Sequence, residues 1–98
     1  MAGDKYDDDK LRYDLIPPNA LDKMVAVLTY GAKKYSPENW RQLDDLQNRY
    51  FAAAQRHLWA MKRGEFYDEE TGEPHLAHAM CCLAFMLEAL EEDNDEKT

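Results

Sequence analysis

The side chains that could do chemistry are concentrated between residues 57 and 87. This stretch contains all the histidines of the chain and a group of carboxylates: His57, His75, His78, Glu65, Asp68, Glu69, Glu70 and Glu73. Imidazoles and carboxylates are the side chains that bind divalent metals and transfer protons. The stretch therefore predicts a metal site. The alternative is a solvated acidic loop with histidines at two helix ends, and solvation is the expectation for Glu69 and Glu70.

Two predicted helices would position these groups. His57 lies near the centre of an apolar helical stripe, where a polar ring must be hydrogen-bonded or metal-bound. His75 and His78 are three residues apart, so they project to the same side at the start of the next helix. A short connection makes the two helices antiparallel neighbours and brings Glu65 and Asp68 close. We expect Glu65, Asp68, His75 and His78 as metal ligands. His57 would be a further ligand or general base, and His57, Glu65 and Asp68 would be the catalytic group.

Hydrophobic periodicity predicts three helices, over residues 20–35, 44–63 and 74–91. Asn19 is the expected N-cap of the first helix, and Gly64 the C-terminal stop of the second. Apolar side chains recur at helical spacing on the third helix and predict its core face: Leu76, Ala79, Met80, Leu83, Leu87 and Leu90. No strand pattern occurs. The predicted fold class is all-α, a small helical bundle of three main helices with an extended N-terminal arm.

The length of 98 residues fits one small domain. We expect a flexible N-terminus over residues 1–9, a single helical domain over residues 10–91 and an acidic tail over residues 92–98. Three helices of this size leave a thin core, and large apolar residues occur on more than one helix face. Sharing such a face between two copies would bury it, so a homo-oligomer, with a dimer as its form, is expected.

Charge and composition exclude several partners. The net charge of −8 argues against a nucleic-acid backbone as partner, because phosphate binding needs a basic face. The start of the chain does not have the pattern of a signal peptide, and the longest apolar run, residues 79–87, is too short for a membrane span. Cys81 and Cys82 are adjacent and have no other cysteine to pair with. They predict reduced core residues in a cytoplasmic protein.

Basic and aromatic residues outside the histidine-rich stretch are candidates for substrate binding. The candidate phosphate contacts are Lys10, Arg12, Lys33, Lys34 and Arg56. Tyr35 and Trp40 are candidates for stacking on a base. Surface charge is the alternative for the basic residues, and a place in the core is the alternative for Trp40.

The chain does not carry the metal-site motifs of two related hydrolase classes in a suitable context. The chain has no His-Asp dipeptide, which excludes an HD-type phosphohydrolase metal site. MazG-type pyrophosphohydrolases hold magnesium with ExxE and ExxD on helices. EETGE at residues 69–73 and EDND at residues 92–95 match those strings. The first contains a turn glycine and the second lies in the expected tail, so we do not assign them to such a site.

Four blocks carry a family resemblance: KLRYDLIPP, LTYGAKKYSPENW, RHLWAMKRGE and DEETGEPHLAHAMCCLAFML. Together and in this order they resemble the small phage-encoded domain named for dATP/dGTP diphosphohydrolase. The resemblance covers about residues 10–88. It implies a mostly helical phage protein, acting in the bacterial host cell and related to nucleotide pyrophosphohydrolases. The implied reaction converts dATP or dGTP to the monophosphate and pyrophosphate.

Such a reaction needs in-line attack of water on phosphorus and divalent ions that neutralise the triphosphate. Oxygen ligands predict magnesium or manganese as the cofactor, and the imidazoles shift the choice toward manganese, zinc or another transition metal. The alternative is a non-catalytic phage protein that binds a nucleotide or inhibits a host protein. A nucleotide binder would keep the basic and aromatic residues but need no metal.

Overall fold

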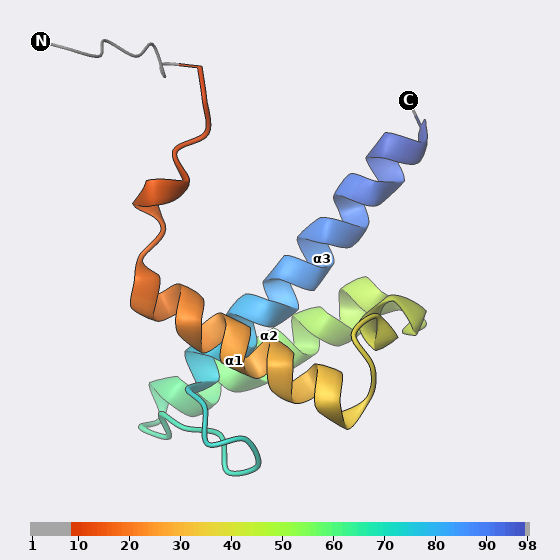
Figure 1. Cartoon of the computed structure of the whole chain (residues 1–98). Coiled ribbons are helices and arrows are strands. Elements are labelled where there is room, and N and C mark those ends of the chain that lie inside the picture. The colour runs from red at the N-terminus through yellow and green to blue at the C-terminus, as the bar shows by residue number, and fades with distance from the viewer. Residues whose placement is uncertain (1–8, 98) are drawn as a thin grey trace, which may run out of the picture.

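The computed structural model describes residues 9–97, with side chains described as far as Asp95 (Figure 1). It consists of α1 (Pro18–Lys34), α2 (Leu46–Lys62) and α3 (His75–Lys97), with short 3-10 turns η1 (Tyr13–Leu15) and η2 (Asn39–Gln42). An isolated bridge joins Tyr67 to Pro74, and the described part of the chain contains no β-strand. The all-α prediction is confirmed, and residues 9–16 extend away from the helices as an arm. Most of the predicted flexible N-terminus, residues 1–8, lies outside the described residues.

All the helix boundaries differ from the predicted ones, most of them by only one or two residues, and the start of α1 and the end of α3 are the informative differences. The N-cap of α1 is Pro17, not Asn19, and no side chain caps this helix. Pro18 can occupy the first position because the missing N–H would have no intrahelical acceptor there. At the other end of the chain, α3 continues to Lys97, so the expected acidic tail is helical that far. The EDND string at residues 92–95 therefore lies on a helix.

The end of α2 follows the predicted glycine stop. Gly64 has a φ of 98°, a value that side chains with a Cβ rarely adopt. The N–H of Gly64 donates to the carbonyl of Met61, and the N–H of Glu65 donates to the carbonyl of Ala60, both at 3.0 Å. These two bonds form a Schellman motif, which satisfies carbonyls that the helix leaves without a partner. The motif turns the chain sharply into the loop that precedes α3.

α3 is the central helix, with both α2 and α1 packed against it. The buried residues are small or medium-sized: Val27, Ala54, Ala77, Ala79, Cys81 and Cys82. Small side chains allow the helices to approach closely. Burial raises the pKa of the Cys81 thiol to about 12 and that of Cys82 to about 11. Both cysteines are free and protonated core residues, as predicted.

The prediction of the core face of α3 is wrong. Of its members only Ala79 is buried, and the large side chains are between 38% and 59% exposed: Leu76, Met80, Leu83, Leu87 and Leu90. The face that packs against the other helices carries the alanine and cysteine side chains. In addition, the C-terminal half of α3 projects away from α1 and α2 (Figure 1). Most of the leucine-rich face is therefore left without cover within the described chain.

Within residues 9–97, no helix combines the length and apolar composition that crossing a membrane requires.

Candidate functional site

The loop between α2 and α3 is held by backbone hydrogen bonds. The N–H of Asp68 donates to the carbonyl of Glu73 at 2.9 Å, and the N–H of His75 donates to the carbonyl of Phe66 at 2.9 Å. Gly72, with a φ of 74°, donates its N–H to the carbonyl of Asp68 at 2.8 Å. These bonds fix the positions of two candidate ligands, Asp68 within the loop and His75 at the start of α3.

Three of the predicted metal-site residues converge, one from α2, one from the loop and one from α3. His57, Asp68 and His75 each offer a ligand atom, and these atoms all lie within 4.8 Å of one another. The two Nδ1 atoms of His57 and His75 are 2.8 Å apart. Burial, together with the neighbouring His78 and His75, lowers the pKa of His57 to about 4. His57 is therefore a neutral imidazole at pH 7, and a neutral imidazole is the form that binds metals.

Asp68 is oriented by its own loop. Its Oδ1 accepts hydrogen bonds from the N–H groups of Glu70 and Thr71, both at 2.9 Å, and from the Thr71 hydroxyl at 3.3 Å. Burial opposes ionisation of this carboxyl group. The hydrogen bonds from Thr71 and Glu70, and the charge that His78 carries at acid pH, outweigh that effect and lower the pKa of Asp68. Asp68 is thus a rigidly held carboxylate.

The remaining predicted ligands lie beside or outside this group. The His78 ring stacks on His57, with centroids 4.5 Å apart and planes at 12°, and its Nε2 is 2.8 Å from the Thr71 Oγ1. One tautomer satisfies all these contacts, with His78 donating through Nε2 and Thr71 donating to Asp68. Burial lowers the pKa of His78. Glu65 is exposed and is not one of the converging residues.

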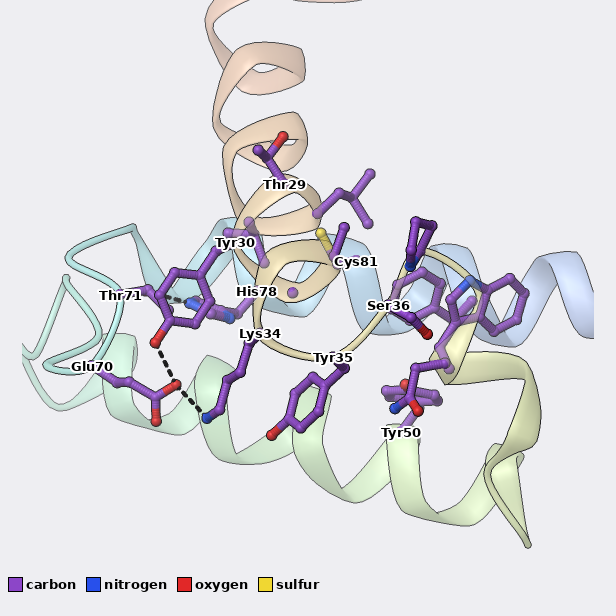
Figure 2. A pocket seen from close by; sticks show the side chains of 18 residues that line it. Thr29, Tyr30, Lys34, Tyr35, Ser36, Tyr50, Glu70, Thr71, His78 and Cys81 are labelled. Atoms are coloured by element: carbon purple, nitrogen blue, oxygen red, sulfur yellow. Dashed lines mark hydrogen bonds and ion pairs between the residues drawn. The ribbon is translucent and has the colours of Figure 1, made fainter.

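A cavity of about 610 Å³ opens beside these histidines (Figure 2). His78 and Thr71 line it, together with three residues predicted to bind substrate: Lys34, Tyr35 and Trp40. One end of the cavity is aromatic. There Phe85 stacks on Trp40, with centroids 4.6 Å apart, and contacts Tyr50 at 5.2 Å. The other end is polar, and it is the end next to the converging histidines.

A hydrogen-bonded network crosses the polar end of the cavity. Glu70 Oε2 accepts a hydrogen bond from the Tyr30 hydroxyl and another from Lys34 Nζ, each at 2.9 Å (Figure 2). The bond from Lys34 is the main cause of the lowered pKa of Glu70. Glu70 was expected to be solvated. It is exposed, but it joins the loop to α1 and neutralises the lysine of the cavity.

The other predicted phosphate contacts do not line this cavity. Lys33 lines a second, more open hollow on α1. Lys10, Arg12 and Arg56 are exposed and line neither hollow. Arg12 forms an ion pair with Asp14 at 2.7 Å. Of the five basic candidates, only Lys34 lies where a ligand of the cavity would meet it.

Sequence reasoning missed several residues that line the cavity: Tyr30, Tyr50, Thr71 and Phe85. Two of them have a recognisable signal. Tyr30 is one helical turn before Lys34, which places the two on the same face. The Asp-x-x-Thr spacing of Asp68 and Thr71 is typical of a turn closed by an aspartate side chain. Nothing in the sequence distinguishes Tyr50 and Phe85 from other apolar residues.

Comparison with known proteins agrees with the resemblance. The profile of the family described as "dATP/dGTP diphosphohydrolase, N-terminal" matches residues 1–98. The chain belongs to this family. A family relative from Salmonella phage PMBT28, named dATP/dGTP diphosphohydrolase, is 35% identical over 86 residues. The match covers 88% of this chain but 29% of the relative, so the chain spans less than a third of that protein's length. No solved structure matches the chain.

Proposed function

We propose that this family member acts as a phage nucleotide pyrophosphohydrolase, converting dATP or dGTP to the monophosphate and pyrophosphate. The observation that carries the proposal is the position of the cavity relative to the metal-binding side chains. A cavity with an aromatic end and a polar end, where Lys34 is paired with Glu70, lies beside three converging metal-binding side chains. A nucleoside triphosphate has a flat base at one end and a strongly charged chain at the other. The family and the name of the phage relative supply the substrate class.

The aromatic end is assigned to the base. Trp40 already has two ring partners, Phe85 and the Arg41 guanidinium at 4.4 Å. Tyr35 is 63% exposed and lines the cavity, and its one ring contact within the described chain is Lys34 Nζ, 5.2 Å from the ring centroid, so the ring can stack on a base next to this lysine. Lys34, at the polar end, is assigned to the triphosphate. A divalent ion held by His57, Asp68 and His75 would neutralise the phosphates and polarise the attacking water.

The reaction breaks one bond and forms one. Water oxygen attacks the α-phosphorus in line, and the bond from that phosphorus to the α–β bridging oxygen breaks, releasing pyrophosphate. The attacking water must lose a proton. Of the three histidines, His78 is the one that lines the cavity, and its lowered pKa leaves it neutral. We assign His78 as the general base, accepting the proton at Nδ1 because its Nε2 donates to Thr71, and this leaves His57 as a metal ligand.

Nucleotide turnover tests this assignment. The chain is incubated with dATP, dGTP, dCTP and dTTP in the presence of magnesium or manganese, and the products are separated by chromatography. We expect monophosphate and pyrophosphate from the purine substrates. His78→Gln should lower kcat by about 100-fold or more with little change in KM, as for loss of a general base. Glu69→Gln, which alters an exposed carboxylate of the same loop that does not line the cavity, should leave kcat unchanged. Full activity of the His78 variant would contradict the assignment.

A nucleotide-binding unit without activity of its own is the second candidate. The chain spans only 29% of the phage relative, and the reaction could need the remainder of such a protein. This small share favours the second candidate. The same cavity would bind the nucleotide in that case. Binding of a non-hydrolysable dGTP analogue, together with no product from dGTP under any metal, would select this candidate over the hydrolase.

A further inference from the structure

We propose that His57, Asp68 and His75 form a site for a divalent transition ion, such as manganese, cobalt or zinc, in preference to magnesium. Both imidazoles would bind the ion through Nδ1. The inference deepens the proposed function and rests on it for the role of the ion. The binding itself requires no nucleotide, so it can be measured separately from hydrolysis.

The first observation is the approach of two ring nitrogens. The Nδ1 atoms of His57 and His75 are 2.8 Å apart, and only one proton fits between them. One ring therefore presents a lone pair toward the other. A divalent ion that replaced this proton would use the lone pairs of both rings. His57 cannot easily rotate away, because His78 is stacked on it at 4.5 Å.

The second observation concerns the carboxylate. Asp68 Oδ1 already accepts three hydrogen bonds from Glu70 and Thr71. These bonds hold the carboxylate in place and leave Oδ2 as the oxygen available to an ion. The ligand atoms of Asp68, His57 and His75 lie within 4.8 Å of one another, so a small displacement would bring all three onto one ion.

The chemical type of the ligand atoms determines which class of ion the site prefers. Magnesium prefers six oxygen ligands and rarely takes imidazole, whereas imidazole nitrogen is a common ligand of zinc, cobalt, iron and manganese. Two nitrogens and one oxygen, without Glu65 as a second carboxylate, thus remove magnesium from the expected ions and leave manganese, zinc or another transition metal. Three protein ligands also leave coordination positions open, which is the pattern of catalytic rather than structural sites. His78 and Thr71 connect the group to the cavity.

Metal binding to the stripped chain tests the site. The chain is treated with a chelator, dialysed and titrated calorimetrically with manganese, cobalt, zinc and magnesium, without nucleotide. We expect at least one transition ion to bind tenfold or more tightly than magnesium. His75→Gln should lower that affinity about tenfold or more. Glu69→Gln, a matched control at an exposed carboxylate of the same loop, should not. The proposed site would be overturned if magnesium bound as tightly as the transition ions. It would also be overturned if both variants lost metal affinity equally.

A second measurement uses the unaltered chain, so it does not depend on the folding of a variant. Long-range proton–nitrogen correlation spectra of the zinc-bound chain report which ring nitrogen of each histidine binds the ion. We expect large Nδ1 shifts for His57 and His75 and a smaller change for His78. Binding through Nε2, or a dominant shift of His78, would overturn the geometry. Selective metal binding without hydrolysis would refute only the proposed function, whereas hydrolysis without such binding would refute only this site.

Discussion

Lys34, the positively charged side chain that lines the cavity, is already paired with a carboxylate. Lys34 donates to Glu70, and the two side chains are 42% and 56% exposed. Exposed pairs of this kind contribute little to stability, because water screens both charges. A triphosphate entering the cavity would compete with Glu70 for Lys34. The carboxylate would also repel the incoming phosphates, so Glu70 should weaken nucleotide binding and not assist it.

Replacing Glu70 by glutamine should therefore strengthen binding. The amide keeps the shape of the side chain but removes its charge, which frees Lys34 for phosphate. We expect the Kd for a non-hydrolysable dGTP analogue to fall about two- to fivefold, the range typical of one exposed ion pair. Calorimetric titration gives the value. Glu69→Gln is the control, since Glu69 is exposed in the same loop but does not line the cavity. Weaker binding by the Glu70 variant would show that Glu70 supports the site.

Two glycines have opposite roles in the helices. Gly64 ends α2 with a positive φ, and it directs the chain into the loop that carries Asp68. Gly31 lies inside α1, and a Cβ added there would meet no atom within 4 Å. The conformation of Gly64 is required by the turn. Gly31 costs stability, because glycine loses more backbone freedom than alanine when a helix forms.

Alanine at these two positions should shift stability in opposite directions. Gly31→Ala should raise the free energy of unfolding by about 0.5–1 kcal/mol, through the smaller entropy of the unfolded chain. Gly64→Ala should lower it by about 1–2 kcal/mol, the cost of a left-handed conformation for a residue with a Cβ. Urea unfolding followed by circular dichroism measures both. A destabilised Gly31 variant would mean that the added methyl group disturbs the cavity wall.

In the described part of the chain, no other element covers one apolar face of α3. Leu76, Met80, Leu83, Leu87 and Leu90 follow one another at alternating spacings of four and three residues, and all are exposed. This is the heptad spacing by which two helices pack along a seam. The C-terminal half of α3 also extends beyond the other helices (Figure 1). A seam of this kind is self-complementary, so a second copy of the chain can cover it.

We therefore expect the chain to dimerise through α3. At micromolar concentration it should sediment at twice the mass of one chain. The double variant Leu83→Gln, Leu87→Gln should sediment as a monomer, because it replaces two central members of the seam by polar side chains. Leu11→Gln is the control, as Leu11 is 79% exposed on the N-terminal arm. A monomeric parent chain would contradict dimerisation, and a dimeric double variant would place the interface elsewhere.

Local patterns were enough to predict the helices from the sequence. Hydrophobic periodicity located all three, and the glycine stop at Gly64 is confirmed, because such signals depend on neighbours within a few residues along the chain. The sequence also placed the histidines near the loop carboxylates. A short connection between antiparallel helices brings those groups together whatever the details of packing.

Only the tertiary structure decided which face of α3 is buried and which side chains meet. Large leucines predicted the core face, yet the closest helix packing uses alanine and cysteine, and hydrophobicity alone cannot rank two apolar faces of one helix. The convergence of His57 with Asp68 and His75, without Glu65, depends on how α2 is rotated against α3. The pairing of Glu70 with Lys34 depends on where the loop folds over α1. Such contacts join residues far apart in sequence, so no local sequence pattern predicts them.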